Sequence, residues 1–305
     1  LENSYERWVE NFGLNLVNIW KEPSVTKLSL DQRNTGKNNA AIVIGAGPSL
    51  HQHNHLKLLA KSGFKGSIIC TDRILIPALK AGITPKKFPK FYVVTIDTAE
   101  KIKKFYDDDI VKKYGSKING LFTIVTNPKT LKIARKNGIK IHWMHALFDY
   151  SEGKKSFNQI SSLIIRAKNS EHGLPGIQTG GNVGTSAWFV GWQILKCKTI
   201  CLIGINHSWN VNDDWKKMAA HCNTPLNIDK KSHLFKKLFP VVYNPEFNSE
   251  CMLDPIFQYY SNALKDFISR APSYVKTINS TEGGCIFGRQ IKCVTFQKFL
   301  KKYRF

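Results

Sequence analysis

The stretch Gly45-Ala-Gly47-Pro48-Ser49 is the first group of residues suited to chemistry, because it joins an apolar run to a helical pattern. Glycines in such a turn let backbone N–H groups approach a phosphate, and the start of a helix favours negative charge. Ser49 supplies a hydroxyl donor or caps the helix, and Pro48 suits a turn or a first helical position. A dinucleotide fingerprint needs a third glycine where Leu50 stands. The stretch therefore predicts a phosphate loop, or a plain tight turn, and no NAD or flavin site.

A second glycine-rich turn, Gly180-Gly181-Asn182, also opens a helical pattern. Its glycines expose backbone donors, while Asn182 and Thr185 offer side-chain donors; capping of the helix is the alternative role for Thr185. Two such turns in one chain suit a crevice that binds a nucleotide together with a second anionic or hydroxylated group.

Two acids close neighbouring apolar runs: Asp72 follows residues 67–71, and Asp97 ends the next run. An acid at this place in Rossmann-like folds accepts hydrogen bonds from a ribose hydroxyl. Two adjacent carboxylates also suit Mg²⁺ held through its waters, which makes Asp97 the candidate metal residue. Each acid alone could equally cap the following helix, but together with the glycine turn they favour a binding site.

Further polar residues end the later apolar runs. Asn206 and His207 end one run, and Asn279 and Glu282 follow the last one, so all four are expected at the same crevice. His207 is the first candidate for a general base and His221 the second, because the unperturbed pKa of histidine lies near neutrality. A lone histidine is nevertheless more often structural.

Composition limits the class of protein. The chain has 305 residues, 42% of them hydrophobic, and 45 basic against 22 acidic residues give a net charge of +23. This charge indicates anionic partners, or it reflects only a lysine-rich solvated surface. The seven cysteines form no zinc-type pairs and are expected to be reduced thiols of a cytoplasmic protein. No apolar run approaches the roughly 20 residues of a membrane-spanning helix.

The order of apolar and helical segments predicts an α/β fold, a Rossmann-like, doubly wound and mostly parallel sheet. Residues 1–38 are expected to form a helical segment and linker, and residues 39–305 the nucleotide-binding domain. Two polar insertions, 149–175 and 209–250, would leave the ligand side of the sheet as loops. The expected strands are 41–44, 67–71, 91–96, 121–126, 140–144, 199–205 and 275–278.

Taken as an ordered set, GAGPSL, Asp72, GGNVGTSAW, LIGIN and INSTEGG resemble the MptE-like/Maf superfamily over roughly residues 40 to 300. That superfamily includes archaeal 6-hydroxymethyl-7,8-dihydropterin pyrophosphokinases and the Maf glycosyltransferases that modify flagellins. The resemblance implies a Rossmann-like core in which both glycine turns line one crevice, with Asp72 and Asp97 on its floor.

The two branches of the superfamily imply different reactions. The pyrophosphokinases carry Asp-x-Asp-Gly after the third strand, where this chain has Thr95-Ile-Asp97-Thr98, so one of the paired acids is missing. The motifs GGNVGTSA, LIGIN and STEGG look like the Maf side. The resemblance therefore favours a glycosyltransferase with a nucleotide-activated sugar, in particular a CMP-linked acidic one, and a small-molecule, glycan or protein acceptor.

Two alternatives stay open. The first is a pyrophosphokinase that uses ATP and Mg²⁺ on a hydroxymethylpterin. The second, suggested by the charge, is a nucleic-acid-binding protein. It ranks lowest because the basic residues are dispersed along the chain, so no stable nucleic-acid partner is expected.

Overall fold

A computed structural model describes residues 2–31, 39–148, 156–166, 174–222 and 231–303. Its centre is a nine-stranded sheet in the order β11-β10-β7-β1-β2-β3-β4-β5-β6, and every neighbouring pair is parallel. The strands are β1 Ala40–Ile44, β2 Ser67–Thr71, β3 Phe91–Thr95, β4 Asn119–Thr123, β5 Lys140–Leu147, β6 Gly176–Gln178, β7 Thr199–Ile203, β10 Lys276–Asn279 and β11 Ile291–Cys293.

The sheet is doubly wound, which confirms the predicted fold class. From β1 the chain builds the sheet in one direction to β6 and then returns to place β7 on the other side of β1. Ile44, the last residue of β1, pairs with Cys70 of β2 and with Ile203 of β7, so the three strands end at one level. In such a sheet, ligands bind where the winding direction reverses, beyond the carboxyl ends of the strands.

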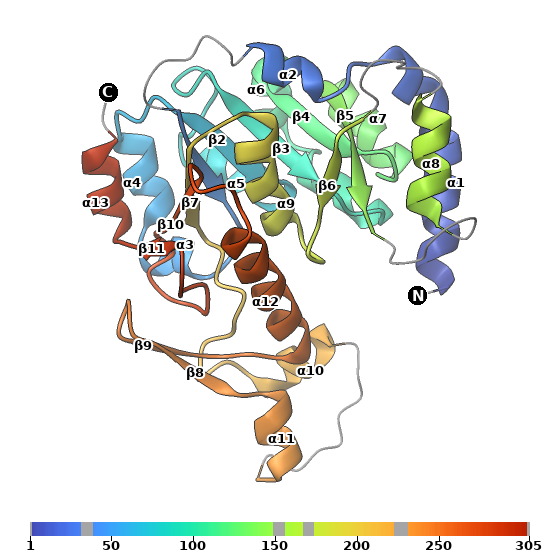
Figure 1. Cartoon of the computed structure of the whole chain (residues 1–305). Coiled ribbons are helices and arrows are strands. Elements are labelled where there is room, and N and C mark those ends of the chain that lie inside the picture. Colours follow the sequence, from blue (N-terminus) through green and yellow to red (C-terminus); the bar gives the residue numbers. More distant parts are fainter. Residues whose placement is uncertain (1, 32–38, 149–155, 167–173, 223–230, 304–305) are drawn as a thin grey trace.

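Helices cover both faces of the sheet (Figure 1). Alternation along β1 sends Ile42 and Ile44 into one buried apolar cluster and Ala41 and Val43 into another on the opposite face. The helices are α1 Glu2–Lys21, α2 Thr26–Asp31, α3 Ser49–Gln52, α4 His55–Lys61, α5 Leu75–Lys80, α6 Asp109–Tyr114, α7 Pro128–Lys136, α8 Phe157–Arg166, α9 Val183–Phe189, α10 Trp215–His221, α11 His233–Leu238, α12 Pro255–Ser269 and α13 Phe296–Lys302. Short 3₁₀ turns η1 Asp72–Ile74, η2 Glu100–Phe105 and η3 Gly115–Lys117 and a π-helical turn η5 Val190–Ile194 complete them.

The N-terminal helix packs closely on the sheet domain. Phe12 and Ile19 of α1 are buried in the first apolar cluster, and Tyr5 contacts Phe157 of α8 with 6.0 Å between ring centroids. The predicted boundary between residues 38 and 39 stays a prediction, because residues 32–38 lie outside the described part of the chain.

The described residues of the insertion at 209–250, which is predicted as a polar loop, form regular elements, while 223–230 lie outside the described part. This insertion contains α10, α11 and most of an antiparallel hairpin of β8 Val241–Asn244 and β9 Ser249–Met252. These elements form a separate layer beyond the sheet, reached by α12 (Figure 1). The first insertion contains α8, while its segments 149–155 and 167–173 lie outside the described residues.

The predicted strands match the structure except at their ends. The predicted strand 121–126 begins and ends later than the observed strand. β4 starts at Asn119 and ends at Thr123, and residues 124–126 turn away after it. The short strands β6 and β11 were not predicted, since three residues carry too little periodicity. No helix of the described residues is long and apolar enough to cross a bilayer.

Candidate functional site

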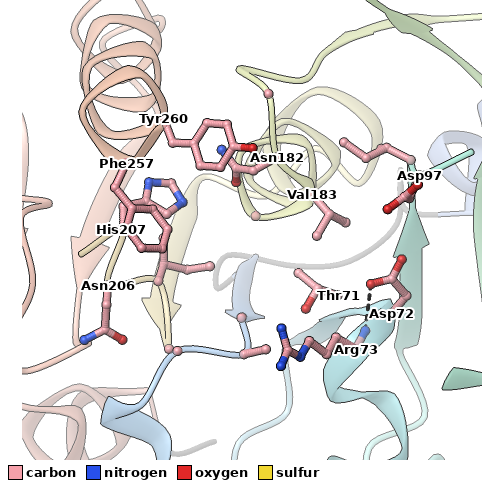
Figure 2. A pocket seen from close by; sticks show the side chains of 18 of the residues that line it. Thr71, Asp72, Arg73, Asp97, Asn182, Val183, Asn206, His207, Phe257 and Tyr260 are labelled. Atoms are coloured by element: carbon pink, nitrogen blue, oxygen red, sulfur yellow. Dashed lines mark hydrogen bonds between the residues drawn. The ribbon is translucent and has the colours of Figure 1, made fainter. Parts of the chain in front are cut away.

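A cavity of about 850 Å³ lies at the carboxyl ends of the strands. One side, the sheet wall, consists of residues that follow β1, β2 and β3 (45–48, 71–73 and 96–98). The opposite side, the hairpin wall, consists of Trp209, His221, Phe257 and Tyr260. Figure 2 shows Asp72 and Asp97 on one side of the cavity and Phe257 and Tyr260 on the other. The sheet thus gathers residues from distant parts of the sequence, as the winding reversal predicts.

The first glycine turn lies against the loop that follows β7. The Gly45 N–H donates to the Ile203 carbonyl at 2.9 Å, and the Gly47 N–H donates to the Gly204 carbonyl at 2.9 Å. A Cβ on Gly47 would lie 2.2 Å from Asn206 Oδ1, so only glycine fits. Both glycines line the cavity, but their N–H groups are occupied. The expectation that these two N–H groups cradle a phosphate is therefore wrong: the glycines are needed for the close approach of two loops.

The residues after this turn divide between the cavity and the interior. Pro48 lines the cavity and, as a proline, offers no N–H donor. Ser49 is fully buried, and its Oγ donates to Asn206 Oδ1 at 2.8 Å. Asn206 itself lines the cavity. Ser49 therefore fixes the loop after β7 in place of the predicted phosphate contact.

The second glycine turn uses its glycines for backbone conformation. Gly180 and Gly181 have φ of +52° and +81°, in the left-handed region that favours glycine. Gly181 and Asn182 line the cavity, whereas Gly180 does not. Thr185 is buried, and its N–H donates to Asn182 Oδ1 at 3.0 Å, so Asn182 caps α9 and Thr185 is a structural residue.

The two predicted acids lie side by side on the sheet wall. Asp72 accepts hydrogen bonds from the Arg73 N–H at 2.7 Å and from Thr95 Oγ1 at 3.1 Å, and Thr95 also bonds to the Tyr106 hydroxyl at 2.6 Å. Burial, with a smaller effect of the Asp97 charge, raises the pKa of Asp72 to about 7 against these hydrogen bonds. Asp97 accepts the Ala99 N–H at 2.8 Å and lines the cavity.

Two basic side chains complete the sheet-side half of the cavity. Arg73 follows Asp72 directly and extends into the cavity (Figure 2). Lys101, in η2, lines the cavity beside Thr98. Neither side chain forms an ion pair with any residue of the described ranges. Both cations are therefore free to bind an anion.

His207 is less suited to be a general base than its sequence position indicates. The residue is 8% exposed, its ring lies near Phe257 and Tyr260, and its buried Nδ1 has no hydrogen-bond partner in the described residues. Burial, with a smaller effect of Lys265, lowers the pKa of His207 to about 4. At neutral pH it is an uncharged wall residue and a weak proton acceptor.

His221 is held in the geometry of a general base. Its Nδ1 lies 2.6 Å from Oδ2 of Asp254, whose side chain is fully buried. Trp209 Nε1 donates to the same oxygen at 2.7 Å, and the Phe257 N–H donates to Oδ1 at 2.7 Å. Burial raises the pKa of Asp254, but these hydrogen bonds outweigh it and hold the pKa below its ordinary value. The ionised carboxylate therefore fixes the His221 tautomer with the proton on Nδ1 and Nε2 free to accept.

Asn279 and Glu282 do not line the cavity, contrary to expectation. Asn279 is fully buried, and its Nδ2 donates to the Ile286 carbonyl at 2.6 Å. Glu282 accepts the Phe296 N–H at 2.9 Å and pairs with His55 Nε2 at 3.2 Å. A polar residue at or after the end of a strand can thus have a purely structural role, as Asn279 and Glu282 do by bonding to other segments.

Within the described ranges, no three His, Cys, Asp or Glu side chains are close enough together to hold a metal ion by themselves. Mg²⁺ on a nucleotide needs only one or two carboxylates besides water and phosphate oxygens. Asp97 and Asp72 meet that requirement, and the metal role of Asp97 stays a prediction.

Several cavity residues escaped the sequence analysis. Arg73 had a signal, since it directly follows a predicted site acid. The others stand in segments without a motif, and only the fold brings them to the cavity: Trp8, Lys101, Phe148, Phe257 and Tyr260. Asp254 does not line the cavity but bonds to His221, which does.

Comparison with known proteins agrees with this architecture. A model of the 6-hydroxymethylpterin diphosphokinase MptE-like family matches residues 10–212. Among solved structures, the Maf glycosyltransferase from Magnetospirillum magneticum AMB-1 is similar, with a TM-score of 0.59 and 13% sequence identity. The similarity covers 92% of this chain and 40% of that one, so the chain spans less than half the length of that enzyme.

At that identity the likeness shows a common fold. No curated protein matches the chain. The family match extends over two thirds of the sequence and includes β1 to β7 with both glycine turns. The chain therefore belongs to the 6-hydroxymethylpterin diphosphokinase MptE-like family.

Proposed function

We propose that the protein is a nucleotide-binding transferase that moves a glycosyl group from a nucleotide-activated sugar, in particular a CMP-linked acidic sugar, to a hydroxyl group. The observation that carries this proposal is the pairing of His221 with the buried Asp254 at a cavity whose opposite wall has unpaired cations. Membership of a family named after a diphosphokinase and the fold of a glycosyltransferase both support a transferase.

The sheet wall would bind the donor nucleotide. Arg73 and Lys101 supply positive charge for the phosphate, and Val183 and Gly184 bring the first N–H groups of α9 to the cavity. Asp97 and Asp72 offer carboxyl oxygens to ribose hydroxyls. Because Arg73 forms no ion pair with an acid of the described ranges, it can neutralise the charge that develops on the leaving phosphate.

The hairpin wall would bind the acceptor. The aromatic rings of Trp209, Phe257 and Tyr260 give an apolar surface for a sugar or peptide face, and His221 lies among them. In the reaction, the acceptor oxygen forms a bond to the anomeric carbon of the donor. The bond between that carbon and the phosphate oxygen breaks, the nucleotide leaves with the electron pair, and His221 Nε2 takes the acceptor proton.

A second function is favoured by one observation, the two neighbouring carboxylates of Asp72 and Asp97. In a diphosphokinase these groups would hold Mg²⁺ on ATP, and the metal would neutralise charge on the transferred phosphates. His221 would then accept the proton of a hydroxymethyl group. We rank this function second because Asp72, with its pKa near 7, is only partly ionised at neutral pH.

Thermal unfolding with CMP, CDP, AMP and ATP, each with and without Mg²⁺, separates the two functions. A rise of the unfolding temperature with CMP or CDP in the absence of metal supports the glycosyltransferase, since bound ligand stabilises the native state. Stabilisation by ATP with Mg²⁺ alone would overturn it in favour of the diphosphokinase. No response to any of these nucleotides would overturn both. Release of CMP from a CMP-linked acidic sugar, followed by chromatography, then measures turnover.

A further inference from the structure

The proposed function leaves open where the base of the nucleotide lies. We propose that the base stacks on a platform of Trp8 and Phe148, so that the N-terminal helix α1 forms part of the nucleotide site. This inference rests on the proposed nucleotide binding and adds a residue from outside the matched family region, which begins at residue 10.

The platform is a pair of aromatic rings that stack on each other at the cavity. The ring centroids of Trp8 and Phe148 lie 5.1 Å apart with an angle of 25° between the planes, and both side chains line the cavity. Ile102 and Phe105 of η2 add further apolar side chains to the cavity lining. Nucleobases stack readily on such rings because every base has a π face.

Two buried asparagines fix α1 to the strand ends. Asn11 Nδ2 donates to the carbonyls of Thr98 at 3.1 Å and Val125 at 2.9 Å, and Asn15 Nδ2 donates to those of Ile124 and Thr126 at 3.1 and 2.7 Å. Trp8 precedes Asn11 by three residues, so it lies on the same face of the helix, one turn earlier. The asparagines thus hold Trp8 at the cavity and satisfy carbonyl groups that follow β3 and β4.

The order of the strands decides which end of the cavity takes the base. The cation Arg73 follows β2, and the candidate ribose acids Asp72 and Asp97 follow β2 and β3. A nucleotide with its phosphate at Arg73 and its ribose at the acids runs away from β1, toward Thr98 and α1. The other end of the cavity is occupied by the hairpin wall, where the acceptor would bind. The Trp8–Phe148 end is therefore the one left for the base.

The test compares three Trp8 variants with a matched control on the same helix. Trp8→Ala and Trp8→Leu remove the stacking ring, Trp8→Phe keeps one, and the control Trp20→Ala removes a 45% exposed tryptophan that does not line the cavity. Calorimetric titration with CMP, ATP and ribose 5-phosphate gives the affinities. Thermal unfolding without ligand shows whether a variant is folded. Trp8→Leu keeps an apolar side chain without an aromatic ring, so comparison with Trp8→Ala separates lost packing from lost stacking.

We expect Trp8→Ala and Trp8→Leu to weaken binding of the preferred nucleotide about tenfold or more, the usual effect of losing a base-stacking ring. Trp8→Phe and Trp20→Ala should stay within about threefold of the original protein, and ribose 5-phosphate should bind all variants alike because it has no base. Nucleotide affinity unchanged in Trp8→Leu overturns the platform and leaves the proposed function standing. If the unaltered protein binds neither nucleotide, the proposed function fails, and the platform with it.

Discussion

The two walls of the cavity differ in how they are built and in how they relate to the family. The sheet wall follows β1, β2 and β3, lies within the matched residues 10–212, and is shaped by backbone constraints such as the approach of Gly45 and Gly47 to the β7 loop. Most of the hairpin wall, including His221, comes after residue 212 and consists of aromatic side chains. The match to the family thus covers the wall that would bind a nucleotide, whereas the wall that would bind an acceptor comes mostly from the insertion and α12, beyond the matched residues.

This difference has a physical basis. Parallel strands that end at one level place backbone and short polar side chains at a fixed edge, which suits a common ligand such as a nucleotide. Segments that connect the strands tolerate changes of sequence better than the sheet itself does. Variants that affect one wall and spare the other therefore test the comparison.

The largest expected effect concerns the hairpin wall. His221→Ala should lower the turnover number about 1000-fold, because a positioned general base contributes about 100- to 10,000-fold to such reactions. Asp254→Asn should lower it about 100-fold, since the tautomer of His221 would no longer be fixed. CMP affinity, measured by calorimetry, should change less than about twofold.

The control for this prediction is His233→Ala, an exposed histidine of α11 outside the cavity lining. It should keep full turnover. A His221→Ala variant that turns over normally, or one that loses CMP binding together with turnover, would contradict the division of labour between the walls.

The second prediction concerns the buried acid of the sheet wall. In the native state the pKa of Asp72 is raised from 3.8 to about 7, so the native protein keeps a proton that the unfolded chain loses. This group therefore lowers stability as the pH rises from about 4 to about 7, by up to about 4 kcal/mol. Asp72→Asn, which has no charge to bury, should gain stability over the original protein across this range.

Denaturant unfolding at pH 5 and pH 8 checks this expectation. The difference in unfolding free energy between Asp72→Asn and the original protein should be larger at pH 8. Equal differences at both pH values would show that Asp72 ionises like an exposed acid. Asp97→Asn serves as the comparison, since Asp97 lies exposed at the cavity and should shift this difference much less.

The smallest expected effect concerns the cation of the sheet wall. Arg73→Ala should weaken CMP binding about tenfold, because a hydrogen bond between charged groups contributes roughly 1.5 kcal/mol or more. Arg289→Ala, which removes an exposed arginine outside the cavity, should leave the affinity unchanged. Unchanged CMP affinity in Arg73→Ala would refute the sheet wall as the phosphate site.

Local patterns of the sequence predicted the framework well. The buried strands appear as continuous apolar runs because both faces of a parallel sheet are covered, and the run at 67–71 coincides with β2. Ten of the predicted site residues also line the cavity: Gly45, Gly47, Pro48, Asp72, Asp97, Gly181, Asn182, Asn206, His207 and His221. Most of them follow a strand by a few residues, so an error of a few residues in the predicted end of the strand still leaves them near the cavity.

Prediction failed where a residue's role depends on a partner far along the chain. The sequence cannot tell that the N–H groups of Gly45 and Gly47 are occupied by carbonyls about 157 residues later, or that Glu282 turns to His55. Sequence position favours His207 over His221 as the general base. In the structure, burial makes His207 a weaker base, whereas the Asp254 carboxylate orients His221.

The sequence by itself determined the doubly wound fold, the approximate positions of most strands and the glycine turns, because hydrophobic periodicity and turn chemistry act over a few residues. Only the tertiary structure decided which polar groups remain free to meet a ligand. It brought Trp8 to the cavity through α1 and set Asp254 behind His221 through α12. Hydrogen-bond partners and burial are properties of the packed chain, and they determine which of the candidate residues are available for chemistry.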